Sequence, residues 1–418
     1  MKARICMSAI AALLISMTPV LAAANDASTA DVTFYKDVLP IIQANCQDCH
    51  REDGTNMGGM VAPMAFTTYQ ETRPWARAIG KAVANRDMPP WDASPIHAGV
   101  FEDERVLTEA EIDTIVRWSR SGAVAGDIAD APASREFAST EGWSIGEPDL
   151  ILQMREPFWV PDELLDNTHY FAITLTQEEL PTDRWIKAVE FRPGSSAVHH
   201  IILRPVGGIA PGNKPSVYRD GYSAKLRAGQ EMRWNMHYHK EPGPGTGVWD
   251  QSAVGIVFYP EGYTPEHVLQ TQPLGNFEFA IPPGEASYTA TAESVFEKDA
   301  LINAMMPHMH LRGVAARYTL YYPDGTEEIL LDVPKYDYNW QTVYRFKQPK
   351  FVPKGTKVGF SGTWNNSADN PWNPDPTRTV TFGEATHEEM LFGFLSYTDP
   401  KEDASGKTGW VRDGSTGD

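Results

Sequence analysis

Residues 316–333 read A-R-Y-T-L-Y-Y-P-D-G-T-E-E-I-L-L-D-V, and this stretch has the pattern of a β-hairpin. Two runs rich in branched and aromatic residues flank Pro323-Asp324-Gly325, and an Asp-Gly turn between such runs is a strong hairpin signal. Similar short runs, bounded by Pro, Asp or Glu, recur from Trp143 onward, and none of them has a convincing helical period. The long C-terminal part of the chain is therefore predicted to be antiparallel β structure.

The β pattern extends too far for a single domain. About 260 residues of short strands exceed what one β-sandwich holds. We therefore expect two antiparallel β-sandwich (jelly-roll-like) domains in series, at residues 143–275 and 276–402. A linker at 125–142, rich in Ala, Asp and Ser, is expected before them, and a flexible tail at 403–418 after them.

The N-terminus has the features of an export signal. Lys2 and Arg4 precede an apolar stretch at 9–21, and three alanines at 22–24 form a small-residue cleavage site. Residues 1–24 are therefore predicted to be a signal peptide, and the mature protein to be periplasmic without membrane insertion. The formal charge of −19 argues against nucleic acid as a partner, since nucleic acid rewards Lys and Arg.

Two cysteines remain after the signal peptide, and both lie in Cys46-Gln47-Asp48-Cys49-His50. This Cys-x-x-Cys-His spacing is the attachment pattern of a c-type haem, in which two thiols join the vinyl groups and His50 becomes an axial ligand. A small redox disulfide is the alternative. Helical patterns at 34–45 and 107–121 flank the motif, so residues 27–124 are predicted to form a small all-α domain that resembles cytochrome c.

The sixth haem ligand is predicted to be a methionine, because this ligand suits an electron carrier. Met88 is the first choice, since bacterial cytochrome domains with a similar Met-Pro-Pro-Trp stretch use that methionine. The alternative is that Met88 only packs under Trp91. Three other methionines are also candidates, namely Met57, Met60 and Met64.

Histidine and methionine residues cluster in the β part of the chain. The first expected β domain contains His199-His200 and, further on, His237-Tyr238-His239. The second contains His308-Met309-His310 and, much later, Met390. In a strand His308 and His310 share one face, whereas adjacent His199 and His200 can meet one ligand only at a strand end or bulge. Each cluster alone has a structural explanation, but two per domain indicate metal sites.

On these motifs, residues from about Trp143 to Pro400 resemble the copper type II, ascorbate-dependent monooxygenases, the family of peptidylglycine α-hydroxylating monooxygenase and dopamine β-monooxygenase, especially their bacterial members. The resemblance implies two copper ions. It assigns His199, His200 and His237 to one ion, although His239 lies on the same strand face as His237 and is the alternative. It assigns the catalytic, oxygen-activating ion to His308, His310 and Met390. Imidazole suits both copper oxidation states, and a thioether favours Cu(I).

The predicted function combines these parts. We expect a monooxygenase that uses O₂ to hydroxylate an activated C–H bond of a small organic substrate. Electrons from a periplasmic donor or small reductant would reach the coppers through the fused haem c, kept close by the tether. Peptide-hydroxylating members have an arginine where this chain has Met306, which indicates a neutral or hydrophobic substrate. The alternatives are a non-enzymatic copper-binding electron-transfer protein and, if Met88 is not a ligand, a haem peroxidase.

Overall fold

The computed structural model describes residues 32–52, 62–137, 142–210, 213–400 and 410–412. The predicted signal peptide lies outside the described residues, as do Met57, Met60 and most of the predicted tail. None of the helices in these described ranges is both long and apolar enough to cross a bilayer.

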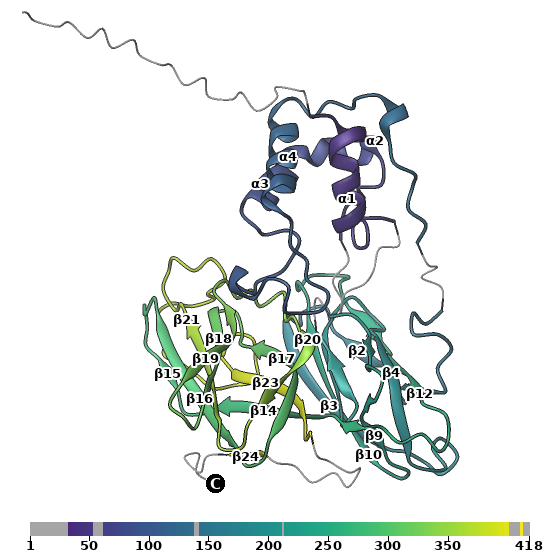
Figure 1. Ribbon diagram of the computed structural model, residues 1–418, viewed down its shortest axis with the longest axis vertical. Coiled ribbons are helices and arrows are strands. Elements are labelled where there is room, and N and C mark those ends of the chain that lie inside the picture. The colour runs from purple at the N-terminus through teal and green to yellow at the C-terminus, as the bar shows by residue number, and fades with distance from the viewer. Residues whose placement is uncertain (1–31, 53–61, 138–141, 211–212, 401–409, 413–418) are drawn as a thin grey trace, which may run out of the picture.

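Short helices form the N-terminal part, which we call the helical region (residues 32–131) and which lies at the narrow end of the molecule in Figure 1. Its α-helices are α1 Leu39–Asn45, α2 Tyr69–Thr72, α3 Ala76–Ala84 and α4 Glu109–Arg120. The π-helix η1 Phe34–Val38 precedes α1, and three 3₁₀ turns lie at η2 Arg73–Trp75, η3 Pro95–His97 and η4 Ile128–Asp130. A small buried core, with Phe34, Ile42, Val83 and Trp118 at its centre, holds these helices together.

The predicted start of the last helix is confirmed. The hydroxyl of Thr108 accepts a hydrogen bond from the Glu111 backbone N–H at 3.3 Å, and the Glu111 carboxylate accepts one from the Thr108 N–H at 2.7 Å. Such a capping box satisfies two N–H groups that the first helical turn leaves unpaired.

The first β region (residues 150–268) has two larger sheets around one core. A five-stranded sheet has the order β1-β12-β4-β7, with β9 also paired to β4, and a four-stranded sheet has the order β3-β10-β5-β6. Two ribbons, β2-β11 and the parallel pair β8-β13, complete it. The strands are β1 Leu150–Gln153, β2 Phe158–Val160, β3 Asp166–Thr174, β4 Arg184–Arg192, β5 Val198–Arg204, β6 Gly207–Ile209, β7 Ser216–Val217, β8 Tyr222–Ser223, β9 Lys225–Leu226, β10 Glu231–His239, β11 Val248–Asp250, β12 Ala253–Phe258 and β13 His267–Val268.

The second β region (residues 270–398, with β24) has a similar plan. Its larger sheets have the orders β14-β23-β17-β20 and β19-β18-β21-β16-β24, and β15 pairs with β22. The opening hairpin is confirmed, because β18 and β19 pair antiparallel around the turn at Asp324 and Gly325. The strands are β14 Gln270–Asn276, β15 Ala280–Ile281, β16 Tyr288–Phe296, β17 Ala300–His308, β18 Gly313–Tyr321, β19 Glu327–Val333, β20 Tyr344–Val352, β21 Lys357–Trp364, β22 Val380–Thr381, β23 Leu391–Thr398 and β24 Trp410–Arg412.

The predicted fold class, a small all-α cytochrome c domain followed by two antiparallel β-sandwich (jelly-roll-like) domains, is wrong for this structure. Strands account for 38% of it and helices for only 13%, and the helices are short. The apolar stripe at 34–45 does not make one helix, because a π-helical turn precedes α1. The described strands form seven sheets, three of which are two-stranded ribbons and one of which is parallel.

The segment between α3 and α4 explains part of this difference. Residues 91–105, which we call the connecting segment, lie within the helical region in sequence. They extend away from its helices and pack against the second β region. Phe101 is fully buried in the core of that region and forms a β-bridge with Phe346. Burial of the Phe101 ring stabilises this docking by about 2–3 kcal/mol. The Ser94 N–H adds a hydrogen bond to the Asp332 carbonyl at 2.8 Å. Long-range contacts of this kind leave no periodic signal in the sequence.

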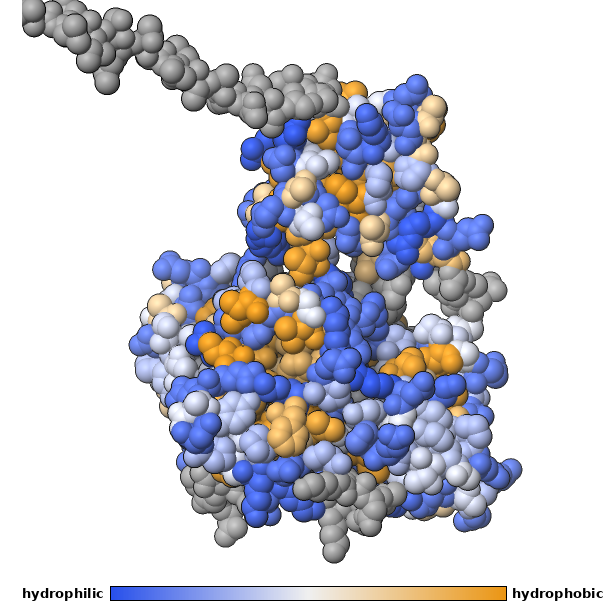
Figure 2. Space-filling view, in the orientation of Figure 1, coloured by the Kyte–Doolittle hydropathy of each residue, from blue (hydrophilic) through white to orange (hydrophobic). Residues whose placement is uncertain are grey.

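The connecting segment also reaches the first β region through two ion pairs, Arg219–Glu102 at 2.7 Å and Lys214–Asp103 at 3.0 Å. Figure 2 shows hydrophobic residues gathered where the helical region approaches the β regions, on a face that is otherwise largely hydrophilic. The three parts are therefore joined by both apolar and charged contacts.

Asp92 in the connecting segment should make stability depend on pH. Burial, helped by the nearby carboxylate of Asp337, raises the pKa of Asp92 to about 7. The folded state thus keeps a proton that the unfolded chain releases near pH 4. The free energy of unfolding is therefore highest below about pH 4 and falls as the pH rises towards 7. Asp92→Asn should raise the free energy of unfolding by about 2 kcal/mol at pH 8 and change it little at pH 4.

Denaturant unfolding of wild type and Asp92→Asn at both pH values measures this difference, with the exposed Asp369→Asn as the control. Equal stabilities of wild type and Asp92→Asn at pH 8 would contradict the prediction.

Candidate metal centre

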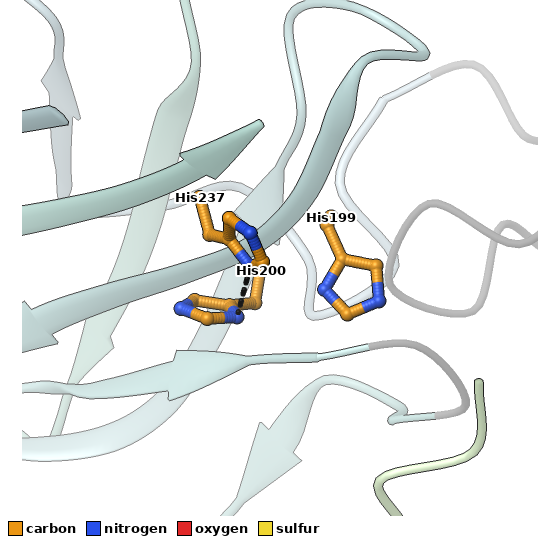
Figure 3. Close-up of side chains that lie close together, drawn as sticks. All are labelled: His199, His200 and His237. Carbon is orange, nitrogen blue, oxygen red and sulfur yellow. Dashed lines mark hydrogen bonds between the residues drawn. The ribbon is translucent and has the colours of Figure 1, made fainter. Parts of the chain in front are cut away.

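Strands β5 and β10 bring three histidines together. In the antiparallel register His237 lies opposite His200, but the next residue, Tyr238, lies opposite Val198. His199 is therefore the extra residue of a β-bulge, which is the irregularity that adjacent histidines need in order to face one point. Figure 3 shows the three rings on neighbouring strands, with a hydrogen bond between His200 and His237.

The geometry of this first histidine group fits a metal ion. One ring nitrogen from each of His199, His200 and His237 lies within 4.8 Å of the others. The Nδ1 atoms of His200 and His237 are 3.4 Å apart, and two nitrogen ligands on one tetrahedral ion with bonds of about 2.0–2.1 Å lie about 3.3 Å apart. The Nε2 atom of His199 is buried without a hydrogen-bond partner, so a bound cation would satisfy a lone pair that is otherwise costly to bury.

Burial favours the neutral form of His199 and His200. Desolvation, followed by the neighbouring histidines, lowers the pKa of His199 and of His200 well below the ordinary value. A neutral imidazole keeps one lone pair, and only this form can bind a metal ion.

A carboxylate orients the third ring. Asp166 at the start of β3 accepts a hydrogen bond from Nε2 of His237, and the side chains of the pair are 10% and 3% exposed. This bond places the ring proton on Nε2 and leaves the Nδ1 lone pair directed at His200. Burial alone would raise the pKa of Asp166, but hydrogen bonds from His237 and Thr386 lower it below its usual range.

The second histidine group lies at the end of β17. His308 is bonded through Nδ1 to the Gln341 side-chain oxygen at 2.6 Å, and His310 through Nδ1 to the Glu388 carbonyl at 3.2 Å. Both rings therefore keep Nε2 for a metal ion, and their centroids are 5.4 Å apart. Burial lowers the pKa of His308 to about 4 and that of His310 to about 3, so both rings are neutral at pH 7.

Met390 directly precedes β23, in which Phe392 pairs with His308 of β17. Its role as a copper ligand stays a prediction. The neighbouring Glu389 holds the backbone around His310 in place. Its buried carboxylate accepts hydrogen bonds from the His310 N–H at 2.8 Å and the Arg312 N–H at 2.7 Å.

The two histidine groups lie against each other, although they belong to different β regions. The ring centroids of His200 and His308 are 6.3 Å apart. Tyr338 fills the space beside them: it stacks on His199 with a centroid distance of 4.7 Å and lies 6.0 Å from His310. The alternative ligand His239 lies at the edge, with its ring 6.2 Å from His199.

The Cys-x-x-Cys-His motif forms one turn after α1. The N–H groups of Cys49 and His50 both donate to the Cys46 carbonyl, at 3.2 and 2.9 Å. The His50 Nδ1 is bonded to the Met64 carbonyl at 3.1 Å, which leaves Nε2 for an axial bond. This local arrangement fits a covalently attached haem. Met88 lies beyond the end of α3, and its role as the sixth ligand stays a prediction.

Several residues of the centre were missed in the sequence. These residues share one property, which is that they bond a histidine or its backbone from a distant part of the chain: Asp166, Tyr338, Gln341, Glu388 and Glu389. A lone Asp or Gln in a strand-rich sequence gives no periodic or motif signal, so only the spatial pairing identifies them.

Comparisons with known proteins do not place the chain in a family. No protein-family model and no curated protein matches it. A solved protein of Eubacterium rectale, thought to be secreted, is similar over 56% of this chain and 69% of its own at 11% identity and a TM-score of 0.20. An infectious bursal disease virus structure, Gx strain, covers 64% of this chain and 75% of its own at 10% identity and a TM-score of 0.17. Scores this low carry no argument about fold or function.

Glu389 should be essential for the stability of the second group. Each carboxylate oxygen accepts at least one N–H bond, including one from the Trp364 indole at 2.8 Å. Glu389→Gln puts an amide donor against one of these donors, and we expect a loss of about 2–4 kcal/mol in the metal-free protein. Denaturant unfolding checks this, with the neighbouring Glu388→Gln as the control. A loss no larger than in the control would contradict it.

Proposed function

We propose that this protein is a periplasmic copper-dependent monooxygenase that hydroxylates an activated C–H bond of a small organic substrate with O₂. The observation that carries the proposal is the closeness of the two histidine groups, in which the ring centroids of His200 and His308 are 6.3 Å apart and both rings are neutral at pH 7. Copper bound there would supply one-electron redox chemistry and activation of dioxygen. Nucleic acid is not expected as a partner, given the formal charge of −19.

The chain's own residues would prepare both sites before a metal ion arrives. Hydrogen bonds to the Asp166 carboxylate, the Gln341 side-chain oxygen and the Glu388 carbonyl orient three of the rings, and the second nitrogen of each ring would bind the metal ion. Burial keeps His200, His308 and His310 neutral and thus able to bind a metal ion. His199, His200 and His237 would hold one ion, and His308, His310 and Met390 the other, catalytic one.

Electron supply is proposed to come from within the chain. Cys46, Cys49 and His50 would hold a haem c, which supplies one-electron transfer when bound. The connecting segment supports this role, because its contacts with both β regions keep the haem motif tethered to the metal centre. The external donor would be a periplasmic protein or a small reductant.

The side chains around His308 favour an apolar substrate. Two phenylalanines of β23 lie beside this ring. The ring centroid of Phe394 is 6.3 Å from that of His308, and the centroid of Phe392 is 5.9 Å from that of Phe394. Met306 is paired with Phe394 in the register of β17 and β23. A carboxylate-bearing substrate would find no cation among these residues, whereas an aromatic or aliphatic one would gain by leaving water.

The copper assignment predicts which histidine variants lose metal. His237→Ala should lower the copper content by one ion per chain, because it removes the ligand nitrogen nearest His200. His239→Ala, on the same strand, should retain both ions. Metal analysis after equilibration with a competing chelator measures the content. Loss of copper in His239→Ala but not in His237→Ala would reverse the ligand assignment.

Oxygen uptake tests the activity itself. Protein loaded with copper and haem, given a reductant and a panel of small apolar and aromatic compounds, should consume oxygen only with particular compounds. His310→Ala should reduce that uptake at least about a hundredfold, since it removes a ligand of the catalytic ion. Asp324→Asn, in a distant turn, serves as the control. Background uptake with every compound, while copper and haem still exchange electrons, would instead favour a copper-binding electron-transfer protein.

A further inference from the structure

The carboxylate of Asp166 joins the two β regions at the metal centre. One oxygen accepts from Nε2 of His237 in the first β region. The other accepts from the backbone N–H of Thr386 at 2.7 Å, and also from its hydroxyl, in the second β region. The two residues are 220 positions apart in the chain, so the contact exists only when the two regions are docked.

The loop that begins at Thr386 continues to the second histidine group. Two residues further on, the Glu388 carbonyl is bonded to Nδ1 of His310 at 3.2 Å. The next residue, Glu389, accepts from the His310 N–H at 2.8 Å. Hydrogen bonds and four residues of backbone therefore connect His237 of one group to His310 of the other.

This connection differs from the other Asp–Thr contacts of the second β region. Asp324 bonds the N–H and hydroxyl of Thr326, and Asp375 bonds the same atoms of Thr377. Both pairs are exposed, span two residues and only close a local turn. Asp166 likewise accepts from the N–H and hydroxyl of a threonine, Thr386. This contact is partly buried, however, and the second carboxylate oxygen accepts from the candidate ligand His237.

We infer that Asp166 and Thr386 couple the two histidine groups, so that a metal ion in one changes the metal affinity of the other. This inference rests on the proposed function only in requiring that both groups bind a metal ion. A cation on Nδ1 of His237 makes its Nε2–H a stronger donor and draws Asp166 towards the ring. Because the same carboxylate holds Thr386, the pull reaches the loop that orients His310. Asp166 is thus a positioning residue for both groups.

Asp166→Asn is the decisive variant, because an amide has one acceptor oxygen where the carboxylate has two. It can accept from His237 or from Thr386, but not from both, so the connection breaks whichever bond remains. Thr386→Ala is the second variant, which removes the hydroxyl bond and leaves the bond between Asp166 and His237. Asp324→Asn is the control, the same substitution away from the metal centre, where the remaining amide oxygen can still accept both Thr326 bonds.

The measurement is the affinity of the first histidine group for Cu(II), by chelator competition followed by electron paramagnetic resonance. It is made for each protein with the second group intact and with the second group removed by His310→Ala. In wild type and in the control, His310→Ala should change this affinity at least about fivefold. With Asp166→Asn the change should fall to less than about twofold, and with Thr386→Ala it should be reduced. Asp166→Asn alone should also weaken the first group about 10–100-fold.

The outcomes separate the two claims. Suppose that wild type binds copper in both groups. If His310→Ala then changes the Cu(II) affinity of the first group equally in wild type, Thr386→Ala and Asp166→Asn, the coupling is refuted and the proposed function stands. If wild type binds copper in neither group, both are refuted. Should Asp166→Asn fail to fold, as metal-free thermal unfolding will show, Thr386→Ala alone decides, and an undiminished effect there refutes the coupling.

Discussion

The crowding of neutral imidazoles between the two β regions is the constraint on which the rest of the structure depends. His237, His308 and His310 are buried, and the rings of His200 and His308 are only 6.3 Å apart. Charged rings at this separation, in a poorly solvated place, would repel one another strongly. The protein therefore keeps His200, His308 and His310 in the neutral form, with one N–H each, and must give their lone pairs a partner or bind a cation there.

Most features of the two β regions follow from this demand. The β-bulge at His199 turns an otherwise outward ring towards its neighbours, at the cost of one regular ladder bond. Gln341 reaches His308 from the loop before β20, and Glu389 reaches His310 from the loop before β23. Each of these residues belongs to a different strand connection. Because Asp166 of the first β region bonds Thr386 of the second, the two regions must be docked before the centre is complete, and this makes their interface part of the site.

The sequence predicted local features well and the surrounding structure poorly, while the metal-ligand assignments stay predictions. The hairpin at Asp324 and the helix expected at 107–121 could be predicted because their signals are local. The apolar stripe at 34–45 is divided between a π-helical turn and α1, and the all-α domain was wrong because Phe101 packs into a β core. The fold class failed for the same reason, since ribbons and parallel pairs depend on contacts between residues far apart in the chain.

The closeness of the two histidine groups could not be predicted from the sequence. Motifs placed one group in each expected domain, and nothing in His199 or His308 predicts that their neighbours share a boundary. The closeness depends on Asp166 and Tyr338, which carry no motif and act through partners 220 and 139 residues away. Because such contacts form only after docking, any change that loosens the interface between the β regions must also alter the electrostatics of both groups. The candidate centre is therefore a property of the docked pair of regions and not of either region alone.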